Sequence, residues 1–270
     1  MKRSIVCEKI RNNEVIMCLK QNFMNPNLTE LIGYSGVDCI WLCNEHQAID
    51  RSLLENMTRT AKITGTDIMI RTSFAGNYTD LIQPLEFGAQ GLMIPHIRSV
   101  EQVRTIVREC KYHPMGMRGM DGVNQDADQG MCPMDEYIKF ANENTFIMIQ
   151  IEDPDALAQV DEIASIPGVD IVFLGPCDYS QSIGRPGDIR HPEVWDAIMR
   201  TAEACAKYGK YCGTPGLGDT EYVKKLIDNN VKFIAGIADW DILHDGIDAE
   251  LKRYDHLGFT RRAYQKIHNC

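Results

Sequence analysis

Short apolar runs alternate along the chain with segments whose apolar residues recur every three or four positions. The runs are typical of buried β-strands, and the recurring pattern is typical of helices that bury one face. Strands are predicted at residues 15–19, 39–43, 67–70, 91–94, 146–151, 169–174, 211–213 and 232–236. Helices are predicted at residues 28–34, 53–63, 78–87, 135–142, 156–164, 191–207 and 221–228, and another opens at the Ser99-Val-Glu-Gln102 capping box.

This alternation predicts an α/β fold, a (β/α)8 TIM barrel in which a helix follows each strand. We expect one TIM-barrel domain over residues 1–270, with an amphipathic tail from about residue 241. A doubly wound open sheet is the alternative. The first strand is not followed by Gly-x-Gly-x-x-Gly, which argues against a dinucleotide-binding fold.

Residues 111–133 interrupt the alternation, because they are rich in Gly, Met, Asp and Asn and show no period. A loop of this length in a compact domain is usually functional or mobile.

Composition narrows the possible partners and the compartment. The net charge of −10 argues against nucleic acid or an anionic membrane as a partner. Ten cysteines are scattered without a Cys-x-x-Cys pair or zinc-ligand spacing, which favours reduced thiols in a cytoplasmic protein. No apolar run approaches the length that spans a membrane, and no signal peptide is evident at the start of the printed sequence.

Two carboxylates follow neighbouring strands in the middle of the chain. Glu152 comes directly after the strand at 146–151, and Asp178 ends the segment Gly175-Pro-Cys-Asp178 after the strand at 169–174. The carboxyl ends of parallel strands lie on one edge, so these side chains are expected to approach each other. Oxygen ligands of this kind suit Mg²⁺ or Mn²⁺. The structural alternative is that Glu152 caps a helix and Asp178 lies in a turn.

Further polar residues follow the other predicted strands. They are Asn44, Glu45 and His46 after the second strand, Arg71 after the third, His96 after the fourth, Gln150 in the fifth and Thr214 after the seventh. In a barrel such residues line one mouth. The set fits enolate chemistry, in which a metal ion and Arg71 polarise a 2-oxo acid and His46 acts as a general base.

Each of these residues also has a structural interpretation. His46 and His96 are compatible with packing roles, and Arg71 with a structural ion pair. Arg118, in the irregular loop, either clamps an anionic substrate or pins the loop to an acidic residue. Free N–H groups at Cys177 and Asp178 are candidates for binding a carboxylate.

Several short motifs in a fixed order resemble one known family. They are Glu45-His46, Ile70-Arg71, Leu85-Glu-Phe-Gly-Ala89, Pro114-Met-Gly-Met-Arg-Gly119, Gln150-Ile-Glu152, Gly175-Pro-Cys-Asp178, Ser182-Ile-Gly184 and His191-Pro-Glu-Val194. Their order and spacing, over about residues 15–240, resemble the HpcH/HpaI class II pyruvate aldolases of the phosphoenolpyruvate/pyruvate barrel superfamily.

The resemblance implies a role for each matching residue. Glu152 and Asp178 would bind the divalent metal ion, which is Mg²⁺, Mn²⁺ or Co²⁺. Arg71 would hold the oxo group, His46 would accept the proton, and Glu86 would raise the basicity of the histidine. The resemblance implies that Gln150 and the backbone of Cys177 and Asp178 contact the substrate. Arg118 in the irregular loop and Thr214 after the seventh strand are further candidates for substrate binding, from their positions.

The resemblance also implies a reaction and an assembly. Members of this family cleave 4-hydroxy-2-oxo acids to pyruvate and an aldehyde. They form hexamers, as trimers of dimers that swap a C-terminal helix, which would give the tail at about 241–270 a role in oligomer contacts. The implied partners are therefore a small 2-oxo acid, an aldehyde and further copies of the chain.

Two segments depart from the family pattern. The family usually has Asp-Gly-Glu-His where this chain has Cys43-Asn-Glu-His46, and a thiol orients a histidine poorly. The loop at 120–128 is acidic where the family's segment is basic. The readings are therefore an aldolase, an oxaloacetate decarboxylase that forms the same enolate, or a non-catalytic barrel that binds an oxo acid.

Overall fold

The predicted strands form one closed parallel barrel. The computed structural model describes residues 1–47, 49–73 and 77–259 of the 270-residue chain. The strands are β1 (Ile16–Gln21), β2 (Cys39–Cys43), β3 (Asp67–Arg71), β4 (Gly91–Ile94), β5 (Phe146–Ile151), β6 (Ile171–Leu174), β7 (Tyr211–Pro215) and β8 (Val231–Ala235). Each strand pairs with the next, and β8 pairs with β1. The (β/α)8 barrel is therefore confirmed, and the open sheet is excluded.

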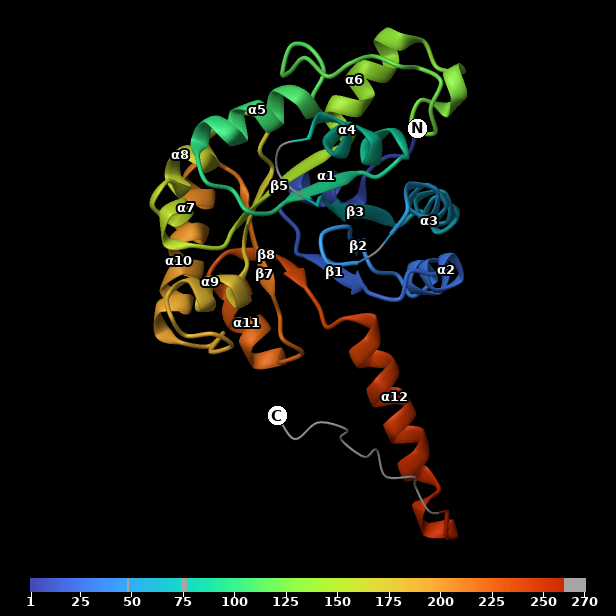
Figure 1. The fold of residues 1–270 in the computed structure, drawn as a ribbon, viewed down its shortest axis with the longest axis vertical. Coiled ribbons are helices and arrows are strands. Elements are labelled where there is room, and N and C mark those ends of the chain that lie inside the picture. Colours follow the sequence, from blue (N-terminus) through green and yellow to red (C-terminus); the bar gives the residue numbers. More distant parts are fainter. Residues whose placement is uncertain (48, 74–76, 260–270) are drawn as a thin grey trace.

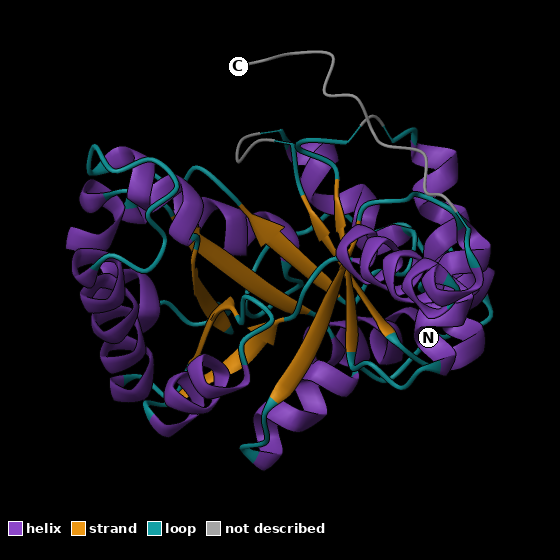
Figure 2. Ribbon diagram, turned by 90° about the horizontal axis from the view of Figure 1, so that it is seen from below, coloured by secondary structure: helices purple, strands orange, loops and turns teal. Residues whose placement is uncertain are grey.

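Helices surround the strands, as Figure 2 shows. They are α1 (Ile5–Asn12), α2 (Pro26–Tyr34), α3 (Arg51–Thr64), α4 (Tyr78–Glu86), α5 (Val100–Cys110), α6 (Met134–Asn144), α7 (Pro154–Ala158), α8 (Val160–Ser165), α9 (Pro176–Ser182), α10 (Pro192–Lys207), α11 (Thr220–Asp228) and α12 (Asp239–Arg253). Two short 3₁₀ turns, Asp128–Gly130 and Asp255–Leu257, complete the described elements.

Three helical features differ from the prediction. The helix expected at 156–164 is two helices, α7 and α8, which meet at Gln159. Helix α9 replaces an expected turn, because Pro176 at its first position favours a helix start. Helix α1 is absent from the prediction, because its polar residues hide a short apolar face. It is anchored by buried Asp67, which accepts hydrogen bonds from Ser4 Oγ and the Val6 N–H.

Alternate residues of each strand point into the barrel and fill it. The inward cluster consists of Ile16, Cys18, Cys39, Trp41, Met69, Met93, Phe146, Met148, Ile171, Phe173, Tyr211, Phe233 and Ala235, together with Val6 and Cys7 of α1. Glycine is required at position 91, because a Cβ there would lie 2.1 Å from the Phe146 ring. Towards the carboxyl ends of the strands, Phe173 makes edge-to-face contacts with Trp41 and Phe233. These rings form the floor of the barrel mouth.

Helix α12 leaves the end of β8 and projects away from the barrel (Figure 1). The loop at 111–133 is irregular as predicted, apart from its 3₁₀ turn, and lies with α6 on the far side of the barrel from α12 (Figure 1). Among the described residues, no helix combines the length and the apolar character needed to cross a membrane.

Candidate active site

A cavity of about 370 Å³ opens at the carboxyl ends of the strands. Its lining residues come from seven strands or the loops after them, and they are Lys20, Trp41, His46, Arg71, Gln150, Phe173, Gly175, Pro176, Cys177, Asp178, Pro215, Ala235, Gly236 and Ala238. The barrel therefore brings His46, Arg71, Gln150, Cys177 and Asp178 together in one mouth, as their positions after the strands predict.

Glu152 and Asp178 belong to the same edge of the barrel. Glu152 follows β5 and its side chain is buried, whereas Asp178 lies in the first turn of α9 and is exposed. Burial raises the pKa of Glu152, and the negative charges of Asp178 and Glu45 raise it further, against the opposing effect of His96. Burial and the neighbouring negative charges make the ionised form of Glu152 unfavourable, so a bound cation would stabilise it. No group of three or more His, Cys, Asp and Glu with metal-binding geometry occurs in the described ranges.

Glu45 is the centre of the charge network. One of its oxygens lies 2.9 Å from Arg71 Nε, and the other lies 2.7 Å from His96 Nε2 and 3.7 Å from His46 Nε2. Its side chain and that of Arg71 are both buried, so the ion pair is well shielded from water. Glu45 thus connects both histidines of the mouth to Arg71.

His96 holds Glu152 through its backbone. The His96 N–H donates to Glu152 Oε2 at 2.8 Å, and its Nδ1 lies 3.5 Å from the same oxygen. His96 takes a left-handed conformation with φ of 55°, which is uncommon for a residue other than glycine. Such strain is retained where the surroundings enforce it, often at functional sites.

Cys43 contacts Arg71 rather than the imidazole of His46. Arg71 Nη2 donates to Cys43 Sγ at 3.1 Å, and the backbone N–H of His46 lies 3.5 Å from the same sulfur. The guanidinium also lies 5.0 Å from the centroid of the Trp41 ring. Cys43 therefore helps to position Arg71, and Glu45 is the acidic group nearest the His46 ring among the ion pairs of the described chain.

Gln150 and Gly175 make room for a ligand beside Glu152. Gln150 is buried, and within the described chain its Oε1 has no hydrogen-bond partner. A Cβ at Gly175 would lie 2.8 Å from Gln150 Nε2 and 3.3 Å from Glu152 Cγ. The orphaned amide oxygen of Gln150 and the carboxylates of Glu152 and Asp178 are oxygen donors of the kind that fit a hard divalent cation.

Glu86 and Arg118 lie elsewhere, which corrects their expected placement beside the mouth. Helix α4 returns the chain from β3 to β4, so its last residue, Glu86, is at the amino end of the barrel. There the Glu86 carbonyl accepts from the Asp126 N–H, and burial raises the pKa of its carboxyl. Arg118 is buried against the Tyr112 ring, 4.8 Å from its centroid. Within one chain, Glu86 does not act on His46 and Arg118 does not reach this cavity.

Thr214 does not line this cavity either. It is fully buried, and its hydroxyl donates to the Leu174 carbonyl at 3.0 Å, so it ties β7 to the end of β6. Its neighbour Pro215 lines the cavity instead.

Lys20 and Trp41 were missed by the sequence reasoning. Ile16 and Cys18 point into the barrel, so the next inward position of β1 is Lys20, which is paired in register with Trp41. The predicted first strand ends before Lys20. Strand alternation continued by one more residue identifies it.

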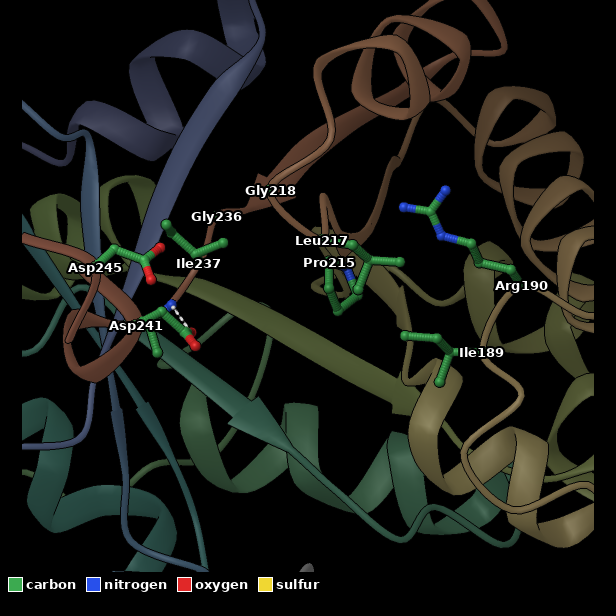
Figure 3. Close-up of a pocket in the computed structure, with 10 residues that line it drawn as sticks. Ile189, Arg190, Pro215, Leu217, Gly218, Gly236, Ile237, Asp241 and Asp245 are labelled. Atoms are coloured by element: carbon green, nitrogen blue, oxygen red, sulfur yellow. Dashed lines mark hydrogen bonds between the residues drawn. The ribbon is translucent and has the colours of Figure 1, made fainter. Parts of the chain in front are cut away.

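A second cavity of about 650 Å³ adjoins the first and shares Pro215, Gly236 and Ala238 with it. Figure 3 shows Asp241 and Asp245 on one side of this space and Arg190 on the other. Arg190 pairs with Asp219 at 2.9 Å. The two cavities therefore share part of one wall.

Comparison with known proteins gives consistent matches. The profile of the family described as HpcH/HpaI aldolase/citrate lyase matches residues 22–236. A hydroxypyruvate/pyruvate aldolase of Delftia acidovorans is 33% identical over 94% of this chain and 93% of its own. A 2-dehydro-3,6-dideoxy-6-sulfogluconate aldolase of Pseudomonas putida is 32% identical over 80% of this chain and 83% of its own. The crystal structure of an HpcH/HpaI aldolase from Desulfitobacterium hafniense superposes with a TM-score of 0.87 at 26% identity, covering 94% of this chain and 98% of that one.

Proposed function

The chain belongs to the HpcH/HpaI aldolase/citrate lyase family, and we propose that it is a metal-dependent aldolase that cleaves a 4-hydroxy-2-oxo acid to pyruvate and an aldehyde. The observation that carries this proposal is the mouth itself. Asp178, Gln150 with its orphaned amide oxygen and buried Arg71 line one cavity at the carboxyl ends of the strands, and buried Glu152 lies beside Gly175 of the same lining. The similarity to aldolases over nearly the whole chain supports it.

Glu152 and Asp178 would hold a divalent ion, Mg²⁺, Mn²⁺ or Co²⁺. The ion, when bound, supplies positive charge that polarises the oxo group of the substrate. Gln150 would contact the oxo acid from the wall of the cavity. The N–H groups of Cys177 and Asp178 lie in the first turn of α9, where a helix has no internal acceptors, so they are available to the substrate carboxylate.

Arg71 would stabilise the enolate of pyruvate. Its Nε pairs with Glu45 and one Nη with Cys43, which fixes the plane of the guanidinium before the substrate arrives. A preorganised cation in a shielded cavity stabilises developing negative charge without reorganisation. The ring of Trp41 supports the guanidinium from one side.

His46 would accept the proton of the 4-hydroxyl group during cleavage. Its ring lines the cavity, and a Glu45 oxygen lies 3.7 Å from Nε2. Glu45 would thus take over the role of the aspartate that the family usually has at the position of Cys43. The proton moves from the hydroxyl to His46 as the carbon–carbon bond breaks.

A specific observation also favours the decarboxylase reading as a second candidate. Cys43 is engaged with Arg71, and the Glu45 oxygen nearest His46 Nε2 lies at 3.7 Å, beyond hydrogen-bond distance. Loss of CO₂ from oxaloacetate forms the same enolate without a base. Such a reaction needs the metal residues and Arg71 but not His46.

The assembly is proposed to be a homo-oligomer, a hexamer in which α12 packs on another copy. Large apolar side chains of α12 are exposed in the single chain, namely Trp240, Ile242, Leu243, Ile247 and Leu251. Exposed apolar faces of this size are typical of interfaces. The nine described cysteines are all free thiols, which supports a reducing compartment such as the cytoplasm.

Removal of either carboxylate tests the proposal. Glu152→Gln and Asp178→Asn are expected to lose metal binding, measured by calorimetry, together with pyruvate release from 4-hydroxy-2-oxo acids. His46→Gln separates the two candidates, because it would stop aldol cleavage but spare oxaloacetate decarboxylation. Full activity in Glu152→Gln contradicts both.

A further inference from the structure

Lys20 is a cation in the barrel mouth to which the proposed reaction assigns no role. It occupies the last inward position of β1, in register with Trp41, and its Nζ lies 5.0 Å from the centroid of the Trp41 ring. The side chain is half-buried and lines the cavity of about 370 Å³. The described residues give its ammonium group no hydrogen bond and no ion pair.

The contacts of Trp41 place Lys20 beside Arg71. The Arg71 guanidinium also lies 5.0 Å from the centroid of the Trp41 ring, and β2, which carries Trp41, is the strand between β1 and β3. The electrostatic neighbours of Lys20 agree with this placement, and they are Cys43, Arg71, Cys177 and Glu45. Cys43 and Glu45 are the two groups that hold Arg71, at 3.1 Å from Nη2 and 2.9 Å from Nε.

Cys177 connects Lys20 with the first turn of α9. Both side chains line the same cavity. Burial and the charge of Asp178 raise the pKa of the Cys177 thiol, whereas the positive charge of Lys20 lowers it. Lys20 is therefore near Arg71, which would hold the oxo group, and near Cys177, whose N–H would contact the carboxylate.

The positive charge of Lys20 has no partner of its own in the described chain, because Glu45 is paired with Arg71. Burial lowers the pKa of Lys20 and Arg71 lowers it further, against the opposing effects of Cys43, Cys177 and Glu45. An anion beside the ammonium group would stabilise its charged form. In a 2-oxo acid the carboxylate and the oxo group are on adjacent carbon atoms, and only the carboxylate is fully negative before the reaction.

We propose that Lys20 binds the carboxylate next to the oxo group and makes the site specific for 2-oxo acids over neutral ketones of the same shape. The inference rests on the proposed function for the placement of the 2-oxo acid at Arg71 and Cys177. Backbone N–H groups accept a carboxylate or a neutral amide oxygen, whereas an ammonium group favours the anion. Lys20 therefore strengthens binding and leaves the rate of the bound substrate nearly unchanged.

Pyruvate and pyruvamide are a matched pair of ligands, because they are similar in shape and differ by one charge. Dissociation constants are measured with Mg²⁺ present, by calorimetry or NMR titration, and methyl-proton exchange in D₂O is followed at saturating pyruvate. We expect Lys20→Met to weaken pyruvate binding about tenfold to 100-fold and pyruvamide binding by less than about threefold. The exchange rate at saturation should stay within about threefold of the wild type.

Three further variants locate the effect. Lys20→Arg keeps the charge and should bind pyruvate more tightly than Lys20→Met does. Lys20→Gln replaces Lys20→Met if circular dichroism shows that the latter is unfolded. The control is Lys225→Met, which removes an equal charge and another lysine–tryptophan contact, at 3.6 Å from the Trp195 ring on α11, and should leave both dissociation constants unchanged.

The outcomes separate this inference from the proposed function. Unchanged pyruvate binding in folded Lys20→Met, or equal weakening of pyruvate and pyruvamide, overturns the inference and leaves the aldolase in place if the wild type shows metal-dependent exchange. A slower exchange at saturation with an unchanged dissociation constant also overturns it, because Lys20 would then act on the enolate. Pyruvate binding that depends on Lys20 in a protein without metal-dependent exchange supports the inference and refutes the aldolase.

Discussion

An alanine at position 175 should damage the candidate metal site while leaving the barrel folded. Gly175 has a φ of −88°, which any residue adopts, so the backbone itself accepts a side chain. The added Cβ would lie 2.8 Å from Gln150 Nε2, 3.3 Å from Glu152 Cγ and 3.6 Å from Glu152 Oε1. The first contact is too short to persist, so Gln150 must move.

The magnitude follows from how little room these side chains have. Gln150 is 2% exposed and Glu152 is 6% exposed, so neither can swing into water. Overpacking of a buried position costs about 1–3 kcal/mol. Alanine at the N-cap of α9 adds a smaller cost of about 0.5 kcal/mol. We expect Gly175→Ala to lower the free energy of unfolding by about 1.5–3.5 kcal/mol and to weaken metal binding at least tenfold.

Urea unfolding and metal titration by calorimetry measure the two effects. The matched control is Gly246→Ala, because no atom lies within 4 Å of a Cβ there and the residue is inside α12. It should leave metal affinity unchanged and raise helix stability by about 0.5–1 kcal/mol. If Gly175→Ala binds metal as tightly as the wild type, Gln150 and Glu152 are not packed around the site as described.

Three further predictions concern the charge network and α12. Glu45→Gln should lower the free energy of unfolding by about 3–5 kcal/mol, because Arg71 is left buried without its partner; a loss below 1 kcal/mol in urea unfolding argues against a buried pair. The raised pKa of Glu152 means that the metal-free protein is stabilised below the usual carboxyl value of 4.5 and loses that stabilisation as pH rises through the folded-state pKa. Since metal binds the deprotonated carboxylate, the increase in melting temperature given by Mn²⁺ should grow with pH from about 4.5 upward, and Glu152→Gln should remove that dependence. Paired Ile247→Asp and Leu251→Asp substitutions should shift the oligomer to smaller species in analytical ultracentrifugation, whereas an unchanged mass would show that the exposed face of α12 is not an interface.

The barrel and the edge of the site could be predicted because both depend on local patterns. Apolar runs separated by helical spacing determine the order of elements, and parallel strands bring the residues at their carboxyl ends to one edge. The placement of Glu152 and Asp178 at this edge follows from the order of the strands alone. Lys20 required only one more step of strand alternation, and it was missed because the predicted strand ends at residue 19, two residues before the end of β1.

The contacts among the residues of the barrel mouth could not be predicted from these local patterns. Whether Cys43 contacts His46 or Arg71 depends on side-chain directions at neighbouring strand ends, and Glu45 becomes central only when three loops meet. Glu86 and Arg118 show a different cause. Glu86 was assigned by family resemblance, although a residue at the end of a barrel helix lies opposite the mouth of its own chain, and Arg118 was a candidate only from its place in the irregular loop.

Exchange of the pyruvate methyl protons with deuterium in D₂O tests the central claim most directly. The measurement is made by NMR with Mg²⁺, Mn²⁺ or Co²⁺ added, with an EDTA control and with Glu152→Gln alongside. We predict exchange that requires a metal ion and is lost in Glu152→Gln. Exchange that survives EDTA, or a folded protein that binds pyruvate and shows no exchange with any of the three ions, would contradict it.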